Sequence, residues 1–340
     1  MLRTYMLLLI IVLIILALVF DFLNGFHDSS NIVATMISSR AFRPRLALGV
    51  TALAEFSGPF IFGVAVAKTI GHDIVAPGTI TIEVILAALS SAILWNLFTW
   101  YFGIPSSSSH ALVGGIIGAV AVGAGLKAIQ LSGLERVLIA LFISPIIGLV
   151  AGFLFTKLVF FLARGASPRI NWFFKRSQII TAVALGLSHG TNDAQKTMGV
   201  ITLGLVTVGY LTHFYIPTWV IALSAGAIAT GTALGGWRLI RTLGGKFYKI
   251  RPVHGFSSQV TSAAVILGAS LVGGPVSTTQ VVSSSILGVG SAERLNKVRW
   301  NVAGNIAIAW LVTIPATAFV AAGLYWLGVR ATPALLSMVR

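Results

Sequence analysis

The sequence predicts an all-α polytopic membrane protein, built of two inverted-topology repeats of about five crossings each, with broken or re-entrant helices. Three observations predict it: an apolar composition, basic residues gathered in a few loops, and polar motifs that occur twice. Hydrophobic residues make up 56% of the 340 residues and charged residues only 9%, and the mean hydropathy is +0.95. Since soluble chains carry about 25% charged residues, this composition excludes a soluble enzyme and a secreted module.

Apolar segments long enough to span a bilayer, which takes about 20 residues, recur along the whole chain. We expect ten crossings in two groups of five: 6–39, 46–68, 81–101, 105–125 and 136–163, then 178–205, 218–240, 256–272, 275–290 and 300–328. The first segment is similar to a signal peptide in its apolar core. It is followed by Asp21 to Asn24 instead of a small-residue cleavage site, so we expect it to be retained.

The 23 lysines and arginines predict how the chain is oriented in the membrane. Most of them lie in four short loops: Arg40–Arg45, Arg164–Arg176, Arg238–Arg251 and Arg294–Arg299. The connections at 69–80, 126–134 and 206–217 carry little positive charge. Because basic loops favour the cytoplasmic side, we expect a multi-pass protein of the cell membrane with both termini outside. The net charge of +15 then reflects orientation and anionic lipid, and we expect no nucleic-acid partner.

Two polar motifs occur in each half of the chain, in the same order. Residues 24–31 (Asn-Gly-Phe-His-Asp-Ser-Ser-Asn) match residues 189–196 (His-Gly-Thr-Asn-Asp-Ala-Gln-Lys) at an offset of 165, and residues 103–110 match 273–280 at an offset of 170. Because the two offsets are nearly equal and the motifs keep their order, we predict a duplication, with repeats at 1–165 and 178–340 joined by a cytoplasmic linker at 166–177. Because five crossings is an odd number, we expect the second repeat to be upside down, as is typical of secondary transporters.

Acidic residues inside or beside apolar segments are the first candidate functional groups. They make up four of the eight acidic residues: Asp21, Asp28, Glu55 and Asp193. A carboxylate at the bilayer centre costs about 2.5–3.5 kcal/mol on insertion scales, so we expect these groups to be paired or to line a hydrated path. Asp28 and Asn31 share a helix face, and Asp193 and Lys196 repeat that spacing.

We interpret the repeated pair as part of a midplane site for a small ion and its coupling cation. The candidate cation-coupling residues are Asp28, Asn31, Asn192, Asp193 and Glu55, with Na⁺ possible at Asp28, Asn31 and Asp193. The structural alternative is that the two aspartates cap broken helices, since a glycine precedes each of them by three residues. The two interpretations are compatible.

A proline followed by hydroxyl residues occurs once in each half, at Pro105 and Pro275. Proline suits the first turn of a helix, so the hydroxyls would lie at helix N-termini, where amide donors and the positive dipole end attract anions. The candidate anion ligands are Ser107, Ser108, Ser109, Ser277, Thr278, Thr279, Asp28, Asp193 and Lys196. Small-residue helix packing is the alternative, but it does not explain hydroxyl runs after a proline twice. His110 is either an anion donor or a buried structural histidine, and we interpret His27 and His189 as structural.

At these motifs the sequence resembles the PiT family of inorganic phosphate transporters. Residues 25–31 and 190–197 are similar to the duplicated Gly-x-Asn-Asp signature of that family, and the two proline-plus-hydroxyl segments to its substrate-binding segments. His27 and the Ser29–Ser30 pair depart from the signature. The resemblance implies a homodimer that carries inorganic phosphate together with Na⁺ or H⁺ and needs no other cofactor. It places Asp28, Asn31 and Asp193 in the site, with the hydroxyls of both segments around the anion.

Taken with this resemblance, the residues predict that phosphate binds between two helix ends, while the aspartates bind the coupling cation or accept a proton. Without a cation, the carboxylates would repel the anion. A sulfate permease is the main alternative, since sulfate is also a tetrahedral dianion, but only phosphate carries a proton near neutral pH. An anion channel would need no buried acidic pair. A membrane hydrolase using Ser109, His110 and Asp193 would lack a nucleophile elbow, so we expect no enzyme.

Overall fold

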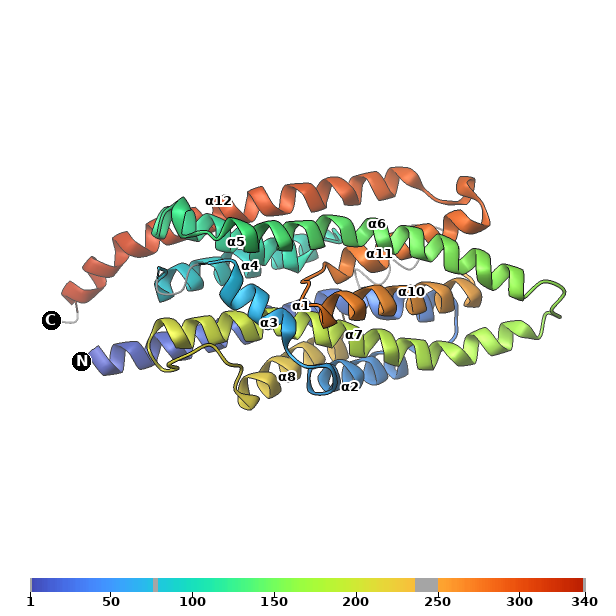
Figure 1. Cartoon of the computed structure of the whole chain (residues 1–340), viewed down its shortest axis with the longest axis horizontal. Helices are drawn as coiled ribbons and strands as arrows, with labels where there is room; N and C mark the ends of the chain where they lie inside the picture. The colour runs from blue at the N-terminus through green and yellow to red at the C-terminus, as the bar shows by residue number, and fades with distance from the viewer. Residues whose placement is uncertain (1, 76–78, 236–249, 339–340) are drawn as a thin grey trace.

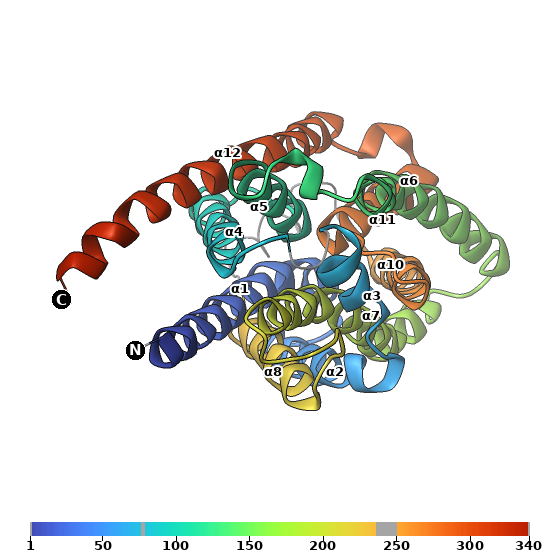
Figure 2. The same ribbon diagram turned by 60° about the vertical axis from the view of Figure 1, so that its left-hand side comes forward.

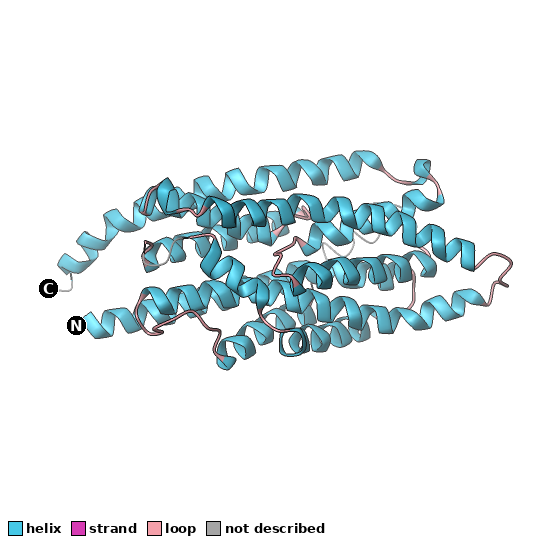
Figure 3. Cartoon of the chain, viewed as in Figure 1, coloured by secondary structure: helices cyan, strands magenta, loops and turns pink. Residues whose placement is uncertain are grey.

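The computed structural model describes residues 2–75, 79–235 and 250–338, most of which are helical. The first half of the chain contains α1 (Leu2–Ser38), α2 (Pro44–Phe62), the short α3 (Ala65–Lys68), α4 (Ile82–Phe102), α5 (Ser108–Gly123) and α6 (Leu131–Leu162). The second half contains α7 (Ile170–Thr207), α8 (Thr218–Leu234), α10 (Pro252–Leu271), α11 (Thr278–Glu293) and α12 (Trp300–Met338). The helices lie along one long axis, with loops at the two ends and in the middle (Figures 1 and 3).

Five of the described helices are long and apolar enough to cross a bilayer: Met6–Ser38, Pro44–Phe62, Ile82–Phe102, Leu131–Leu162 and Trp300–Val329. Large apolar side chains point outward from them, such as Leu53 of α2, Ile146 of α6 and Phe319 of α12. Such side chains would be a liability in water but suit the hydrocarbon of a membrane. The predicted all-helical, multi-pass membrane fold is confirmed.

Two helix pairs turn back in the middle of the molecule instead of crossing it separately (Figure 1). α4 turns into α5 at residues 103–107, and α10 turns into α11 at residues 272–277. Both turns begin at a glycine of positive φ, Gly103 at 67° and Gly273 at 75°. α5 and α11 have 16 residues each, a length of about 24 Å against a hydrocarbon core of about 30 Å. Segments expected as four crossings therefore form two re-entrant hairpins.

The second crossing of the chain is a broken helix. α2 ends at Phe62, Gly63 takes a φ of 85°, and α3 then continues into a π-helical turn at Thr69–Asp73. Gln195 of α7 binds this break: its Oε1 accepts from the amides of Val66 (2.7 Å) and Ala67 (3.2 Å), and its Nε2 donates to the carbonyl oxygen of Gly63 (2.5 Å). These bonds satisfy backbone groups that a break within a membrane would leave without partners. The corresponding crossing at 218–240 lies partly outside the described residues.

Both chain termini lie at one end of the molecule, and the loops after α1, α6 and α11 lie at the other (Figure 1). The basic clusters at Arg40–Arg45, Arg164–Arg176 and Arg294–Arg299 therefore share one end. Most of the cluster at Arg238–Arg251 lies outside the described residues. The end that faces the cytoplasm stays a prediction from charge.

Helices of the two halves pair crosswise. α2 packs on α7 and α8 on α1, while α11 packs on α6 and α5 on α12. The α1–α7 pair lies between α2 and α8 on one side and the two hairpins on the other, with α12 and α6 beyond the hairpins (Figure 2). A Cβ on Gly25 of α1 would overlap the Ile228 carbonyl oxygen, and one on Gly190 of α7 would overlap that of Glu55. These glycines hold matching motif positions, and α1 and α7 run in opposite directions (Figure 1), which supports the predicted inverted duplication.

Candidate substrate and cation site

A layer of buried polar side chains separates two apolar cores in the middle of the molecule. In α1, Phe20 belongs to one core and Ile32 to the other, and most residues between them are polar and buried. α7 has the same arrangement between Leu185 and Met198. The matched motifs thus meet at mid-depth, far from either end of the bundle.

The first cluster consists of Asp28 and Asn31 of α1 with Thr278 and Thr279 at the start of α11. Asn31 Nδ2 donates to Asp28 Oδ1 at 2.7 Å and to Thr279 Oγ1 at 3.1 Å. Thr279 Oγ1 donates to Asp28 Oδ1 at 2.7 Å, and Thr278 Oγ1 lies 3.1 Å from Asp28 Oδ2. All four side chains are buried. Carboxylate, amide and hydroxyl oxygens are the ligands that hard cations prefer, so this cluster can hold a cation.

The second cluster consists of Asp193 and Lys196 of α7 with Ser109 of α5. Lys196 forms a close ion pair with Asp193 and donates to Ser109 Oγ at 2.6 Å and to the carbonyl oxygen of Val276 at 2.8 Å. Thr278 Oγ1 connects the two clusters, since it lies 2.7 Å from Asp193 Oδ2. A hydroxyl has one proton to donate, so it serves one of the two carboxylates at a time.

His189 joins three buried carboxylates. Its Nε2 lies 2.9 Å from Asp193 Oδ2 and 3.5 Å from Asp28 Oδ2, and its Nδ1 lies 2.9 Å from Glu55 Oε1. The ligand atoms of Asp28, His189 and Asp193 all lie within 4.8 Å of one another. The sequence analysis interpreted His189 as structural and did not predict its contacts with the three carboxylates. The available signal was its spacing of four residues from Asp193, which puts both on one helix face.

The tips of the two re-entrant hairpins meet beside these clusters. Ser107 Oγ accepts from the amide of His110 at 3.1 Å, and Ser277 Oγ accepts from the amide of Gln280 at 3.4 Å, so each serine caps its helix. His110 Nε2 and Gln280 Nε2 lie 3.3 Å apart across the junction. The N-termini of α5 and α11, with their amide donors and positive dipole ends, thus meet in one place. The roles of the hydroxyls as phosphate ligands stay predictions.

The remaining predicted residues lie outside the two clusters. Ser108 Oγ donates to Asn24 Oδ1 at 2.5 Å. Asn192 Nδ2 donates to Ser270 Oγ at 2.8 Å and to the carbonyl oxygen of Gly274 at 3.3 Å, so its amide group holds the second hairpin. Asp21 accepts from Thr197 Oγ1 at 2.6 Å and connects α1 to α7.

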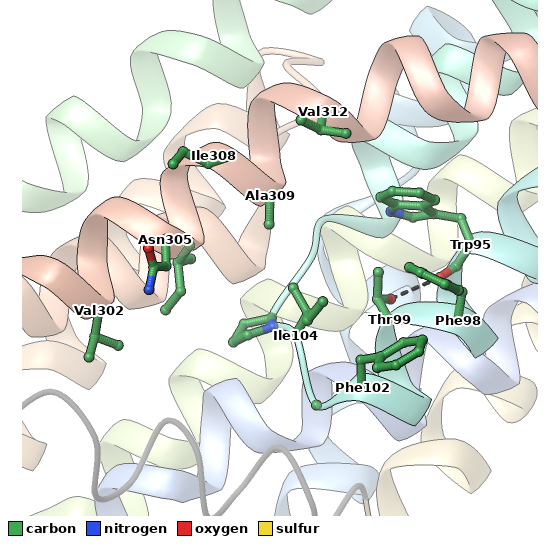
Figure 4. A pocket seen from close by; sticks show the side chains of 13 residues that line it. Trp95, Phe98, Thr99, Phe102, Ile104, Val302, Asn305, Ile308, Ala309 and Val312 are labelled. Atoms are coloured by element: carbon green, nitrogen blue, oxygen red, sulfur yellow. Dashed lines mark hydrogen bonds between the residues drawn. The ribbon is translucent and has the colours of Figure 1, made fainter.

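A separate cavity of about 520 Å³ lies beside the first hairpin, between α4 and α12 (Figure 4). Its lining is mostly apolar, with Trp95, Phe98 and Ile104 facing Ile308 and Val312. An inorganic anion requires charged or hydrogen-bonding donors, so this cavity does not fit phosphate. The buried polar layer is the better candidate for the substrate site.

A helical membrane protein whose hairpins meet at buried, paired carboxylates has the architecture of a transporter. The particular family follows from comparison with known proteins. The chain belongs to the phosphate transporter family, whose model matches residues 24–321. This is a family of transporters rather than enzymes, and the predicted function, phosphate transport across a membrane, is confirmed.

Individual relatives cover nearly the whole chain. A probable low-affinity inorganic phosphate transporter of Bacillus subtilis is 47% identical over 326 residues, covering 95% of this chain and 98% of the relative. A protein of Rhizobium meliloti with the same description is 44% identical over 320 residues, covering 94% and 96%. A solved structure described as the sodium-dependent phosphate transporter is similar with a TM-score of 0.85 at 25% identity, covering 94% of this chain and 98% of that one.

Proposed function

We propose that this protein is a phosphate symporter in which phosphate binds between the N-termini of α5 and α11, and the coupling cation, Na⁺, binds at Asp28. One observation carries the proposal. Thr278 and Thr279 begin α11 and at the same time contact the Asp28 carboxylate, at 3.1 and 2.7 Å. The helix end suited to the anion and the carboxylate suited to the cation therefore share two side chains.

These shared hydroxyls give a physical reason for coupling. Without a cation, the hydroxyl protons of Thr278 and Thr279 are directed at carboxylates, and the charge of Asp28 repels phosphate. A cation at Asp28 neutralises that charge and coordinates the hydroxyl oxygens, so that their protons can turn toward phosphate. Each ion then favours binding of the other.

The oxygen atoms of the first cluster, which could coordinate a cation, favour Na⁺ over H⁺ as the coupling ion. Asn31 Oδ1 is buried and has no hydrogen-bond partner among the described residues, because the amide group directs its Nδ2 at Asp28 and Thr279. Rotation of this amide would present Oδ1 to a bound cation. Na⁺ needs several oxygen ligands of this kind, whereas a proton on Asp28 needs only one acceptor. H⁺ coupling through His189 and Glu55 is the second candidate. Their contact at 2.9 Å extends the chain of buried ionisable groups from Asp28 and Asp193 away from the hairpin tips, and a proton could move along such a chain.

The cellular arrangement is part of the same proposal. We infer a multi-pass protein of the cell membrane with both termini outside, because three basic clusters share the end opposite to the termini. A homodimer, which the family resemblance implies, is testable by cross-linking in native membranes.

Uptake of radiolabelled phosphate into proteoliposomes tests the proposal, under an inward Na⁺ gradient or a pH gradient, with unlabelled sulfate as competitor. We expect accumulation driven by Na⁺ and unaffected by sulfate. Accumulation driven only by a pH gradient would assign the carboxylates to protons. Full block by sulfate would contradict the selectivity for phosphate.

A further inference from the structure

Lys196 holds in the second half of the chain the position that Asn31 holds in the first. Each follows its aspartate by three residues, Asp28 and Asp193 respectively. Asn31 contacts Thr279, the second residue of α11, and Lys196 contacts Ser109, the second residue of α5. The two clusters are therefore built alike, except that one contains a neutral amide and the other an ammonium group.

The surroundings of the Lys196 ammonium are those of a bound cation. Its partners are the Asp193 carboxylate, the Ser109 hydroxyl at 2.6 Å and the Val276 carbonyl oxygen at 2.8 Å. Carboxylate, hydroxyl and freed backbone carbonyl oxygens are also ligands of Na⁺ in transporters with broken helices. The side chain is only 2% exposed. An ammonium group has three N–H donors, and here all three have an oxygen partner, so none is left over for phosphate.

We propose that the Lys196 ammonium is a tethered cation that occupies the second of two matching cation sites. The protein then carries one mobile cation fewer per phosphate than two open sites would bind. The inference rests on the proposed function in one respect, the binding of the mobile cation at Asp28. Because Ser109 and Val276 belong to different hairpins, the ammonium also joins the two hairpin tips at any external cation concentration.

The variant Lys196→Asn tests this inference, because it gives the second cluster the same carboxylate, amide and hydroxyl as the first. We would measure the Na⁺ dependence of phosphate uptake in proteoliposomes and the net charge moved per phosphate. The wild type should show a Hill coefficient of about 1 and the variant one of about 2, since the coefficient is limited by the number of sites. Halving a low Na⁺ concentration should then lower uptake about fourfold in the variant and about twofold in the wild type. The variant should also move one more positive charge.

Lys157→Asn is the matched control, since Lys157 is an exposed lysine of α6 that lies over the Phe153 ring. It should keep the wild-type Na⁺ dependence. A Lys196→Asn protein that transports phosphate with the wild-type Hill coefficient and charge would overturn the inference.

The outcomes separate this inference from the proposed function. If Na⁺ does not drive the wild type, the proposed coupling ion is wrong. A Na⁺-dependent component that appears in Lys196→Asn but not in Lys157→Asn would still support the tethered cation. If Lys196→Asn does not fold, the wild type decides: one coupled cation per phosphate supports the inference, and two or more overturn it.

Discussion

The buried charges of the polar layer are not paired equally. Asp193 has the ammonium of Lys196 as a direct partner. Asp28 is held by the hydroxyls and amide of the first cluster, and the nearest ring nitrogen, that of His189, lies 3.5 Å away. Because an uncompensated charge inside a membrane is costly, Asp28 gains more from a mobile cation than Asp193 does. This difference is the reason why we propose the first cluster as the site of the coupling ion.

Asp28→Asn should therefore abolish Na⁺-coupled phosphate uptake in a protein that still folds. The amide keeps the size of the carboxylate and an oxygen that accepts from Thr279, but it lacks the charge. We expect uptake to fall at least about tenfold, because hydrogen bonds to charged groups contribute about 1.5–3 kcal/mol each. Asp73→Asn, at a partly exposed aspartate that pairs with His72, should leave uptake unchanged. Near-normal uptake by Asp28→Asn would exclude Asp28 as the cation site.

Single residues of this site could be predicted where they recur. Asp28, Asp193 and the hydroxyls after the two prolines were identifiable because the same pattern occurs twice. The spacing of His189 from Asp193 indicated a shared helix face, but its contact with Glu55 was not identifiable, because another helix brings Glu55 to the imidazole. Contacts made by packing leave no spacing signal in the chain.

At the scale of elements, hydropathy predicted the helices but not how deep they reach. α4 has 21 residues and is apolar enough to cross a membrane, yet it turns back at mid-depth. The turns are held by tertiary contacts: Trp310 Nε1 donates to the Pro105 carbonyl oxygen at 3.2 Å, and Lys196 binds that of Val276. Composition and length do not encode these contacts, so a crossing and a re-entrant helix look alike in sequence.

The crosswise helix pairs depend on small residues, which gives a stability prediction. Gly190→Ala would place a Cβ against the backbone carbonyl oxygen of Glu55, which cannot move aside as a side chain could. Overpacking of this kind costs about 1–3 kcal/mol, so the thermal midpoint of the detergent-purified protein should fall.

Gly49→Ala is the control, because Gly49 of α2 has no described atom near the position of a new Cβ. It should be neutral or slightly stabilising, since alanine favours a helix over glycine by about 1 kcal/mol. Equal thermal midpoints for the two alanine variants would contradict the close approach of α7 to α2.

At the scale of the whole molecule, the basic clusters and the repeated motifs predict an arrangement with which the described helices are compatible. The described basic clusters share one end, both termini share the other, and α1 and α7 run in opposite directions. These features agree with a duplicated, inverted chain even though two hairpins replace four crossings. Each hairpin returns to the side from which it entered, as two successive crossings would. Replacing two crossings by one hairpin therefore leaves the orientation of the following helices unchanged.

The absence of cysteine from the sequence makes the orientation directly testable. Ser167 lies in the exposed loop before α7 and Thr212 in the exposed loop after it, so the two flank one helix. A membrane-impermeant maleimide applied to intact cells should label Thr212→Cys at once, and Ser167→Cys only after permeabilisation. The reverse pattern would invert the orientation predicted from the basic loops.

The central claim is that phosphate and its cation share the side chains between Asp28 and the start of α11. Calorimetric titration of the purified protein with phosphate, in Na⁺ and in choline buffers of equal ionic strength, tests this most directly. The shared site predicts that Na⁺ tightens phosphate binding by about 5–150-fold, with phosphate tightening Na⁺ binding by the same factor. Equal phosphate affinity in the two buffers would contradict it.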